Sequence, residues 1–171
     1  GRTVVEETLE LCASRLRSGA NVVVYPAGRI LRSRWESLRG NSAVWAILQK
    51  VPDARVVLIR TGGLWGSRFS WGVTGASPDV PRVVRQCVWD VLRNAVFFLP
   101  KRDVTLEFVE PADFPAAADR QTINRYLENF YNQGAPTNTY VPRAFWERGG
   151  PRVVPGPSLN VPAAIEFSGE D

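Results

Sequence analysis

A run of arginines directly follows an apolar segment near the N-terminus. Asn21 to Tyr25 is dominated by β-branched residues, Pro26 to Gly28 has the composition of a turn, and three arginines follow closely: Arg29, Arg32 and Arg34. Ligands of open α/β sheets bind beyond the strand ends, and a guanidinium presents a fork of donors that matches phosphate and carboxylate oxygens. The sequence therefore predicts an anion site for a phosphorylated substrate here. A solvated basic loop is the alternative.

Two residue types are missing from the 171-residue chain, because it contains no His and no Met. Without His, mechanisms that use a Ser-His, Cys-His or His-Asp pair are excluded within this chain, as are His-ligated metals and haem. Cys12 and Cys87 have no metal-binding spacing, and we expect them to be buried small hydrophobic residues. We therefore expect no metal and no cofactor. The absence of Met leads us to expect a longer protein whose other part holds the catalytic group.

The charge and hydropathy of the chain exclude two further classes. The 21 basic and 17 acidic residues give a net charge of +4, and no nucleic-acid-binding motif is present, so we expect no nucleic acid partner. No apolar stretch approaches the roughly 20 residues that a membrane span requires.

Helices and strands are expected to alternate along the chain, and they would position the arginines. Apolar residues at spacings of three and four predict four helices, over 3–17, 42–50, 81–99 and 120–131. β-branched runs predict two buried strands, over 21–25 and 55–60, and alternation predicts a half-exposed strand over 104–109. The fold class is therefore α/β, with a mixed and largely buried sheet flanked by helices. We expect this domain to span residues 1–134, and residues 135–171, with six Pro, to form an extended tail or linker.

The segment that contains the first arginine resembles a known motif. Tyr25-Pro26-Ala27-Gly28-Arg29, after an apolar strand, is similar to the third motif of the glycerolipid acyltransferases, the family of lysophosphatidic acid and glycerol-3-phosphate acyltransferases, which reads Phe-Pro-Glu-Gly-Thr-Arg-Ser. Val56 to Arg60 resembles the family's fourth motif, and the order of the later elements also agrees. The resemblance covers residues 2–133. It departs from the pattern at Ala27, where the family has Glu, at Arg29 in the Thr position and at Ile30 in the Arg position.

The resemblance implies an activity and a set of site residues. The reaction would move a fatty acyl group from an acyl-CoA or acyl-carrier-protein thioester to the hydroxyl of a lysophospholipid or glycerophosphate. Arg29 and Arg32 would hold the acceptor's phosphate. The remaining site residues would shape the turn (Tyr25, Pro26, Ala27, Gly28) or border the acyl or acceptor pocket (Arg60, Trp65). The family's His-x-x-x-x-Asp motif has no counterpart here, so we expect no catalytic residue in this chain and no activity from the chain alone.

The resemblance also implies a partial acyltransferase-like fold and a peripheral location at the cytoplasmic, inner face of a membrane. A non-catalytic phospholipid- or partner-binding module of the same fold remains the alternative. A hydrolase of different design is disfavoured, because the chain has neither His nor a paired carboxylate.

Two aromatic segments allow two interpretations each. Thr61 to Pro78 holds five Gly and two Trp. This loop either lines an acyl channel or enters the headgroup region of a membrane, or it packs over the core. Asn94 to Arg102 combines an apolar cluster with two cations, which would suit a membrane-facing helix end. Burial of Phe97 and Phe98 in the core is the more ordinary outcome, and it is the one that we expect.

Overall fold

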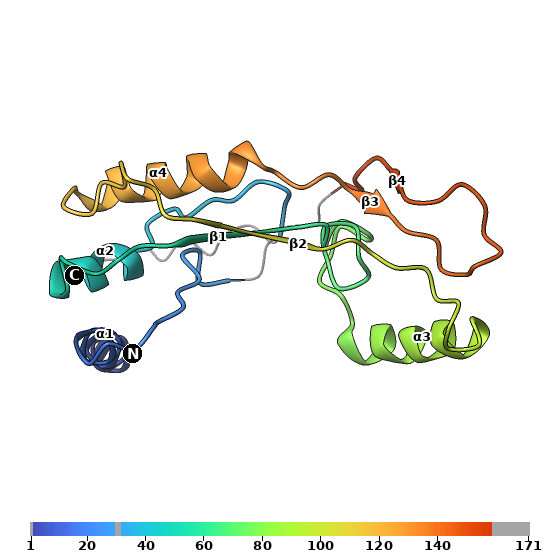
Figure 1. The fold of residues 1–171 in the computed structure, drawn as a ribbon, viewed down its shortest axis with the longest axis horizontal. Helices are drawn as coiled ribbons and strands as arrows, with labels where there is room; N and C mark the ends of the chain where they lie inside the picture. The colour runs from blue at the N-terminus through green and yellow to red at the C-terminus, as the bar shows by residue number, and fades with distance from the viewer. Residues whose placement is uncertain (1, 30–31, 159–171) are drawn as a thin grey trace. The chain divides into compact units, whose positions relative to one another are not determined.

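The computed structural model describes residues 2–29 and 32–158, and it belongs to the mixed α and β class (Figure 1). These residues group into two compact units. Unit 1 consists of Gly1–Ile30, Trp35–Gly62 and Thr105–Ala135, and unit 2 consists of Leu31–Arg34, Gly63–Val104 and Pro136–Asp171. The elements are, in chain order, α1 (Arg2–Arg17), α2 (Ala43–Lys50), β1 (Leu58–Gly62), α3 (Val80–Arg93), β2 (Thr105–Val109), α4 (Arg120–Gln133), β3 (Thr139–Tyr140) and β4 (Arg152–Val153).

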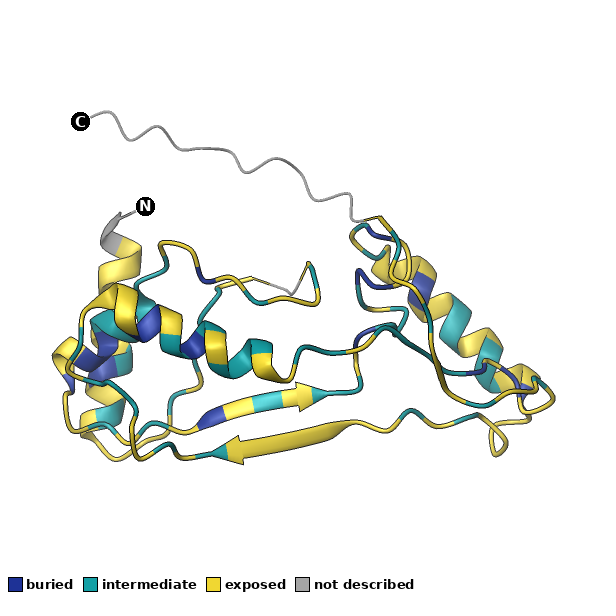
Figure 2. Cartoon of the chain, turned by 90° about the horizontal axis from the view of Figure 1, so that it is seen from above, coloured by how far each residue is buried: buried dark blue, intermediate teal, exposed yellow. Residues whose placement is uncertain are grey.

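Unit 1 is built on an antiparallel pair of strands, β1 and β2, in which Leu58 lies opposite Val109 and Ile59 opposite Phe108. Alternate residues of a strand point to opposite faces. Leu58 therefore joins a buried cluster of leucines and one isoleucine from α2, α4 and the loop before α2: Leu38, Leu48, Ile123 and Leu127. Figure 2 shows the buried residues of the described chain in dark blue. Burying each such side chain contributes about 2 kcal/mol to stability.

The second face of this sheet carries apolar side chains that are exposed. Ile59 from β1 and Leu106 and Phe108 from β2 belong to this face, as the register of the two strands requires. β2 is therefore exposed over most of its length, beyond the half-exposure expected for residues 104–109.

The four predicted helices are confirmed, although α3 ends earlier than expected. Aspartate side chains cap the N-termini of α3 and α4. Asp119 caps α4 by accepting a hydrogen bond from the Thr122 N–H at 2.7 Å, and Asp79 caps α3 by accepting from the Arg82 N–H at 3.1 Å. α3 ends at Arg93 instead of continuing to residue 99, because Ala95 and Val96 adopt positive φ angles of 47° and 67°.

The strand predicted over 21–25 is wrong for the described structure. Residues 21–25 belong to neither sheet, although their exposure alternates as in a strand: Val22 and Val24 are half-buried, whereas Val23 and Tyr25 are exposed. β propensity reflects packing against a neighbouring strand, and here no ladder partner is hydrogen-bonded to the segment. A cavity of about 140 Å³ is instead lined by Val22, Val24 and residues 54–58. The second predicted strand also begins later, at Leu58.

Unit 2 combines α3 with the glycine- and tryptophan-rich loop and with residues 136–158. The last of these, expected as an extended tail or linker, contribute β3 and β4, in which Tyr140 lies opposite Arg152. The loop packs closely on β3, since the Thr139 N–H donates to the Trp65 carbonyl at 3.2 Å. Gly66 permits this approach: its φ is 89°, and a Cβ there would lie 2.5 Å from the Thr139 carbonyl oxygen.

Candidate functional site

The turn that follows Tyr25 is present as expected. The Gly28 N–H donates to the Tyr25 carbonyl at 2.9 Å, and Gly28 has a φ of 62°. Asn41 holds the turn from outside, because its side-chain amide donates to the Pro26 carbonyl at 2.9 Å. Tyr25 itself is 79% exposed. Ala27, in contrast, packs against the core of unit 1.

The two arginines expected to share a phosphate lie in different units. Arg29 belongs to unit 1, is exposed, and donates from Nη2 to the Ser37 carbonyl at 3.1 Å. Arg32 belongs to unit 2, where its guanidinium carbon lies 5.6 Å from the ring centre of Trp71. Nothing in the described contacts brings these two side chains into one site.

Arg60 is engaged in holding unit 1 together. It donates to Glu107 Oε2 from Nε at 2.9 Å and from Nη2 at 2.6 Å, and from Nη1 to the Phe130 carbonyl at 3.0 Å. Its guanidinium also lies 4.9 Å from the ring centre of Phe130. Gly134 makes room for it, since a Cβ there would lie 2.6 Å from Arg60 Nη1. Arg60 therefore links β1, β2 and the C-terminal end of α4.

Trp65 is 7% exposed, which agrees with the alternative in which its loop packs over a core. Its carbonyl accepts from both the Thr139 N–H and Arg102 Nη1. Trp71 is similarly buried, whereas Phe69 is half exposed. The two tryptophans thus anchor the loop, and the residues between them are left to line a cavity.

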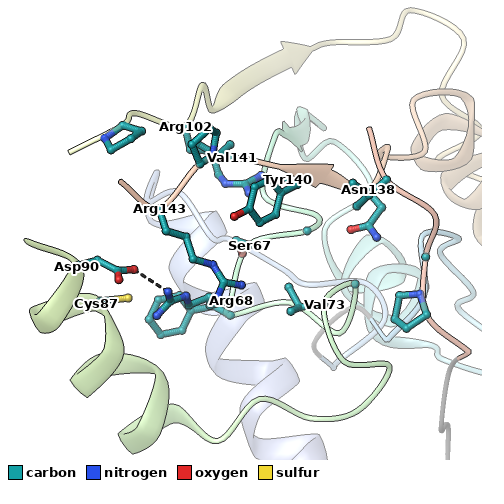
Figure 3. A pocket seen from close by; sticks show the side chains of 18 of the residues that line it. Ser67, Arg68, Val73, Cys87, Asp90, Arg102, Asn138, Tyr140, Val141 and Arg143 are labelled. Atoms are coloured by element: carbon teal, nitrogen blue, oxygen red, sulfur yellow. Dashed lines mark ion pairs between the residues drawn. The ribbon is translucent and has the colours of Figure 1, made fainter. Parts of the chain in front are cut away.

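That cavity has a volume of about 490 Å³ and lies within unit 2 (Figure 3). Its walls come from the loop between the tryptophans, from the inner side of α3, and from two stretches of the Pro-rich segment, 138–143 and 154–157. Most of the lining is apolar, with Phe69, Val91 and Val141 among the contributors. Its size falls within the range of about 300–1,000 Å³ that is typical of small-molecule sites.

An ion pair forms one side of the cavity. Arg68 Nη2 lies 2.7 Å from Asp90 Oδ2, and the two side chains are only 16% and 17% exposed. Arg68 Nη1 also donates to Gln86 Oε1 at 3.2 Å. Both partners of Arg68 come from α3, so this arginine fixes the loop against the helix.

A second arginine closes the cavity at β3. Arg102 donates from Nη1 to the Gly63 carbonyl at 2.7 Å and from Nη2 to the Thr139 carbonyl at 2.8 Å. Burial lowers the pKa of the Arg102 guanidinium. Because its acceptors are neutral carbonyls, no acidic partner offsets this charge among the bonds it makes here, and the cavity wall is electropositive.

Three further polar side chains line the cavity. Arg143 extends toward Ser67 and Arg68 (Figure 3), and its guanidinium lies 5.8 Å from the Tyr140 ring centre. The Tyr140 hydroxyl donates to Glu147 Oε1 at 2.7 Å, and burial together with this bond raises the pKa of Tyr140. Asn138 Oδ1 is buried and has no hydrogen-bond donor within the described structure.

Arg102 and Arg143 beside an apolar wall favour a ligand with an anionic group and an apolar body, whereas the charge of Arg68 is balanced by Asp90. Among residues 2–29 and 32–158, no group of three or more His, Cys, Asp or Glu could hold a metal ion. This cavity was not predicted from the sequence, because its lining residues are dispersed before, within and after α3.

No family model, no curated protein and no solved structure matches this chain. None of the helices in the described part of the chain has the length and apolar character needed to cross a bilayer.

Proposed function

We propose that this chain is the substrate-binding part of an acyltransferase that moves a fatty acyl group from an acyl-CoA or acyl-carrier-protein thioester to a lysophospholipid or glycerophosphate hydroxyl. The observation that carries the proposal is the 490 Å³ cavity, whose apolar walls and arginines suit an amphiphile with an anionic group. The motif Tyr25 to Arg29 and the order of the elements after it support the same assignment.

In this proposal each unit has a binding site of its own. The cavity of unit 2 takes the apolar chain, with Arg143 near its anionic end. The turn over Tyr25 to Gly28 presents Arg29, whose side chain is exposed, to the acceptor's phosphate. Arg60 and Trp65 act as structural supports of the two units, because their contacts are already made within the chain.

The proposed fold is a partial acyltransferase-like α/β domain in which further structure covers the sheet. The exposed apolar side chains Ile59, Leu106 and Phe108 support this, since an apolar sheet face is normally packed against another layer. The proposed location is the cytoplasmic face of a membrane, where lysophospholipid acceptors are found. Because the chain contains no His, the proposal assigns the proton transfer to residues outside this sequence.

Measuring the binding of lysophosphatidic acid to the chain tests whether the cavity is the ligand site. We expect Arg143→Ala to weaken binding about tenfold, because a charge-assisted hydrogen bond to a ligand is worth roughly 1.5–3 kcal/mol. Arg148→Ala is the matched control, since Arg148 is exposed and does not line the cavity. Calorimetry or a fluorescent analogue measures the dissociation constants. Equal affinity of the two variants would remove the cavity from the proposal.

Acyl transfer by the longest natural protein that carries this chain tests the activity. We expect Arg29→Ala combined with Arg32→Ala to raise the KM for the phosphorylated acceptor or to lower kcat. Each single variant is measured too, because the two arginines lie in different units. Unchanged kinetics would refute the phosphate contact. Ligand binding without any transfer would favour the non-catalytic module of the same fold.

A further inference from the structure

α3 turns polar side chains toward the interior of unit 2. Asp90 pairs with Arg68, as described above, and Asn94 at the end of the helix is completely buried. The Asn94 amide donates to the Arg143 carbonyl at 2.9 Å, and its oxygen accepts from the Phe145 N–H at 2.8 Å. Rotating the helix would leave these buried groups without partners. The orientation of α3 is therefore fixed by its polar contacts.

The same orientation exposes an apolar stripe on the outer side of α3. Val84, Val88 and Leu92 recur every four residues, and all three are exposed. Trp89 lies next to this stripe and is also exposed. An ordinary surface helix turns its apolar residues inward. α3 instead carries apolar residues on both sides, since Val83 is buried and Val91 lines the cavity.

The turn after α3 extends the exposed apolar surface. Ala95 and Val96 take left-handed φ angles, and the Val96 N–H donates to the Val91 carbonyl at 2.9 Å, which redirects the chain. Phe97 is consequently 87% exposed, and Phe98 is exposed as well. The expectation that these two rings lie in the core is wrong, because a continuous helix would have been needed to carry them inward.

Aromatic contacts join this turn to residues 145 and 146. The rings of Phe98 and Phe145 lie 5.5 Å apart, those of Phe145 and Trp146 4.9 Å apart, and Arg93 lies 5.7 Å from the Trp146 ring. We call the exposed apolar residues of the outer side of α3, of this turn and of residue 146 the α3 patch, and define it by Val88, Trp89, Leu92, Phe97, Phe98 and Trp146. All six side chains are exposed.

The surroundings of the α3 patch are positively charged. Three exposed cations adjoin it in the sequence, Arg85, Arg93 and Lys101. Unit 2 contains eleven basic and seven acidic residues, whereas unit 1 contains ten of each. Three acids of its described part are engaged within the unit, since Asp79 caps α3, Asp90 pairs with Arg68, and Glu147 accepts from Tyr140.

We propose that the α3 patch docks unit 2 on an anionic lipid surface. Phe97 and Trp89 enter the boundary between headgroups and acyl chains, where aromatic rings are favoured, and the flanking cations contact anionic headgroups. Charge complementarity selects this partner, because an apolar patch bordered by cations fits a negatively charged bilayer. The inference does not depend on acyl transfer, and it holds for a purely binding protein as well.

Flotation of the full chain with lipid vesicles tests the proposal. We expect binding to vesicles of phosphatidylcholine mixed with phosphatidylglycerol, weak binding to phosphatidylcholine alone, and a loss of binding with rising salt. Arg85→Gln should weaken partitioning about fivefold, from roughly 1 kcal/mol per cation near an anionic surface. Arg125→Gln, which removes an exposed arginine from α4 in unit 1, is the control and should have no effect.

The apolar part of the α3 patch is tested by a second pair of variants. Phe97→Ala should weaken partitioning at least fivefold, whereas Phe108→Ala, which removes an exposed ring from unit 1, should not. Circular dichroism shows that each variant is folded. Equal losses in both variants, or equal binding to neutral and anionic vesicles, would overturn the proposal. So would a dimer in the absence of lipid that Phe97→Ala dissolves, because the patch would then join two copies of the chain.

Discussion

Ala95 and Val96 are consecutive residues with positive φ angles, and neither is glycine. Each costs roughly 1 kcal/mol relative to an ordinary backbone conformation. The buried Asn94 accounts for their persistence, because its hydrogen bonds to residues 143 and 145 fix the position of the turn. Stabilising contacts of one residue thus compensate for strain in the next two.

Ala95→Gly should therefore stabilise the protein by about 0.5 kcal/mol. Glycine removes the left-handed strain, and the greater freedom of the unfolded chain offsets only part of that gain. Ala46→Gly is the matched control, since Ala46 lies inside α2 and the same change there should destabilise by about 1 kcal/mol. Urea unfolding measures both. A loss of stability in Ala95→Gly would contradict the account of strain.

For single residues, the sequence predicts local conformation better than the contacts that a side chain makes. The turn at Tyr25 to Gly28 was predicted correctly. The resemblance implied that Arg60 and Trp65 border a pocket. In the structure Arg60 holds two strands to a helix, and Trp65 is packed in its loop. The partners that decide these tasks, Glu107 and Thr139, are distant in sequence and carried no signal.

The helices of unit 1 owe their boundaries to short-range chemistry. The Thr122 N–H donates to the Asp119 carboxylate, and this bond is the main cause that holds the pKa of Asp119 below its ordinary range. A carboxylate with a lowered pKa contributes stability at neutral pH, and that contribution is lost as the pH falls through the pKa of the folded state. α4 should therefore be weakened by acid.

The variant Asp119→Asn distinguishes the effect of the carboxylate charge from the effect of the capping hydrogen bond. Asparagine caps a helix as well as aspartate does, but it does not titrate. We expect the free energy of unfolding to fall less in the variant than in the native chain between pH 7 and about pH 3, as measured by urea titration at each pH. An identical fall in both proteins would show that other carboxylates control the acid response.

Elements with a local signal were predictable, and those that depend on a partner were not. Helical periodicity gave four helices, and alternation gave the strand that became β2. The run at residues 21–25 has the composition of a buried strand, yet no described strand pairs with it. β3 and β4 were hidden in a Pro-rich segment, because each is only two residues long and exists through its pairing with the other.

The molecule as a whole divides into units that the sequence order does not reveal. Unit 2 is assembled mainly from residues 63–104 and 136–158, with unit 1 contributing the stretch between them. The cavity could not be predicted for the same reason, since its walls come from both parts of unit 2. Fold class followed from the pattern of elements, whereas the site followed from tertiary contacts.

We expect the two units to unfold separately. Leu127→Ala removes a side chain that is completely enclosed in the core of unit 1 and should destabilise that unit by about 2–5 kcal/mol. Hydrogen exchange followed by mass spectrometry should then show faster exchange in α4 and unchanged exchange in α3. Faster exchange in both helices to the same extent would indicate a single cooperative structure.

The open face of the β1–β2 sheet also governs how the chain behaves at high concentration. Unit 1 carries equal numbers of acidic and basic residues, so little electrostatic repulsion keeps two such faces apart. Ile59, Leu106 and Phe108 then offer a surface on which molecules adhere without specificity. Colloidal stability therefore rests on the charge of unit 2, and screening that charge with salt would favour clusters that grow from the sheet.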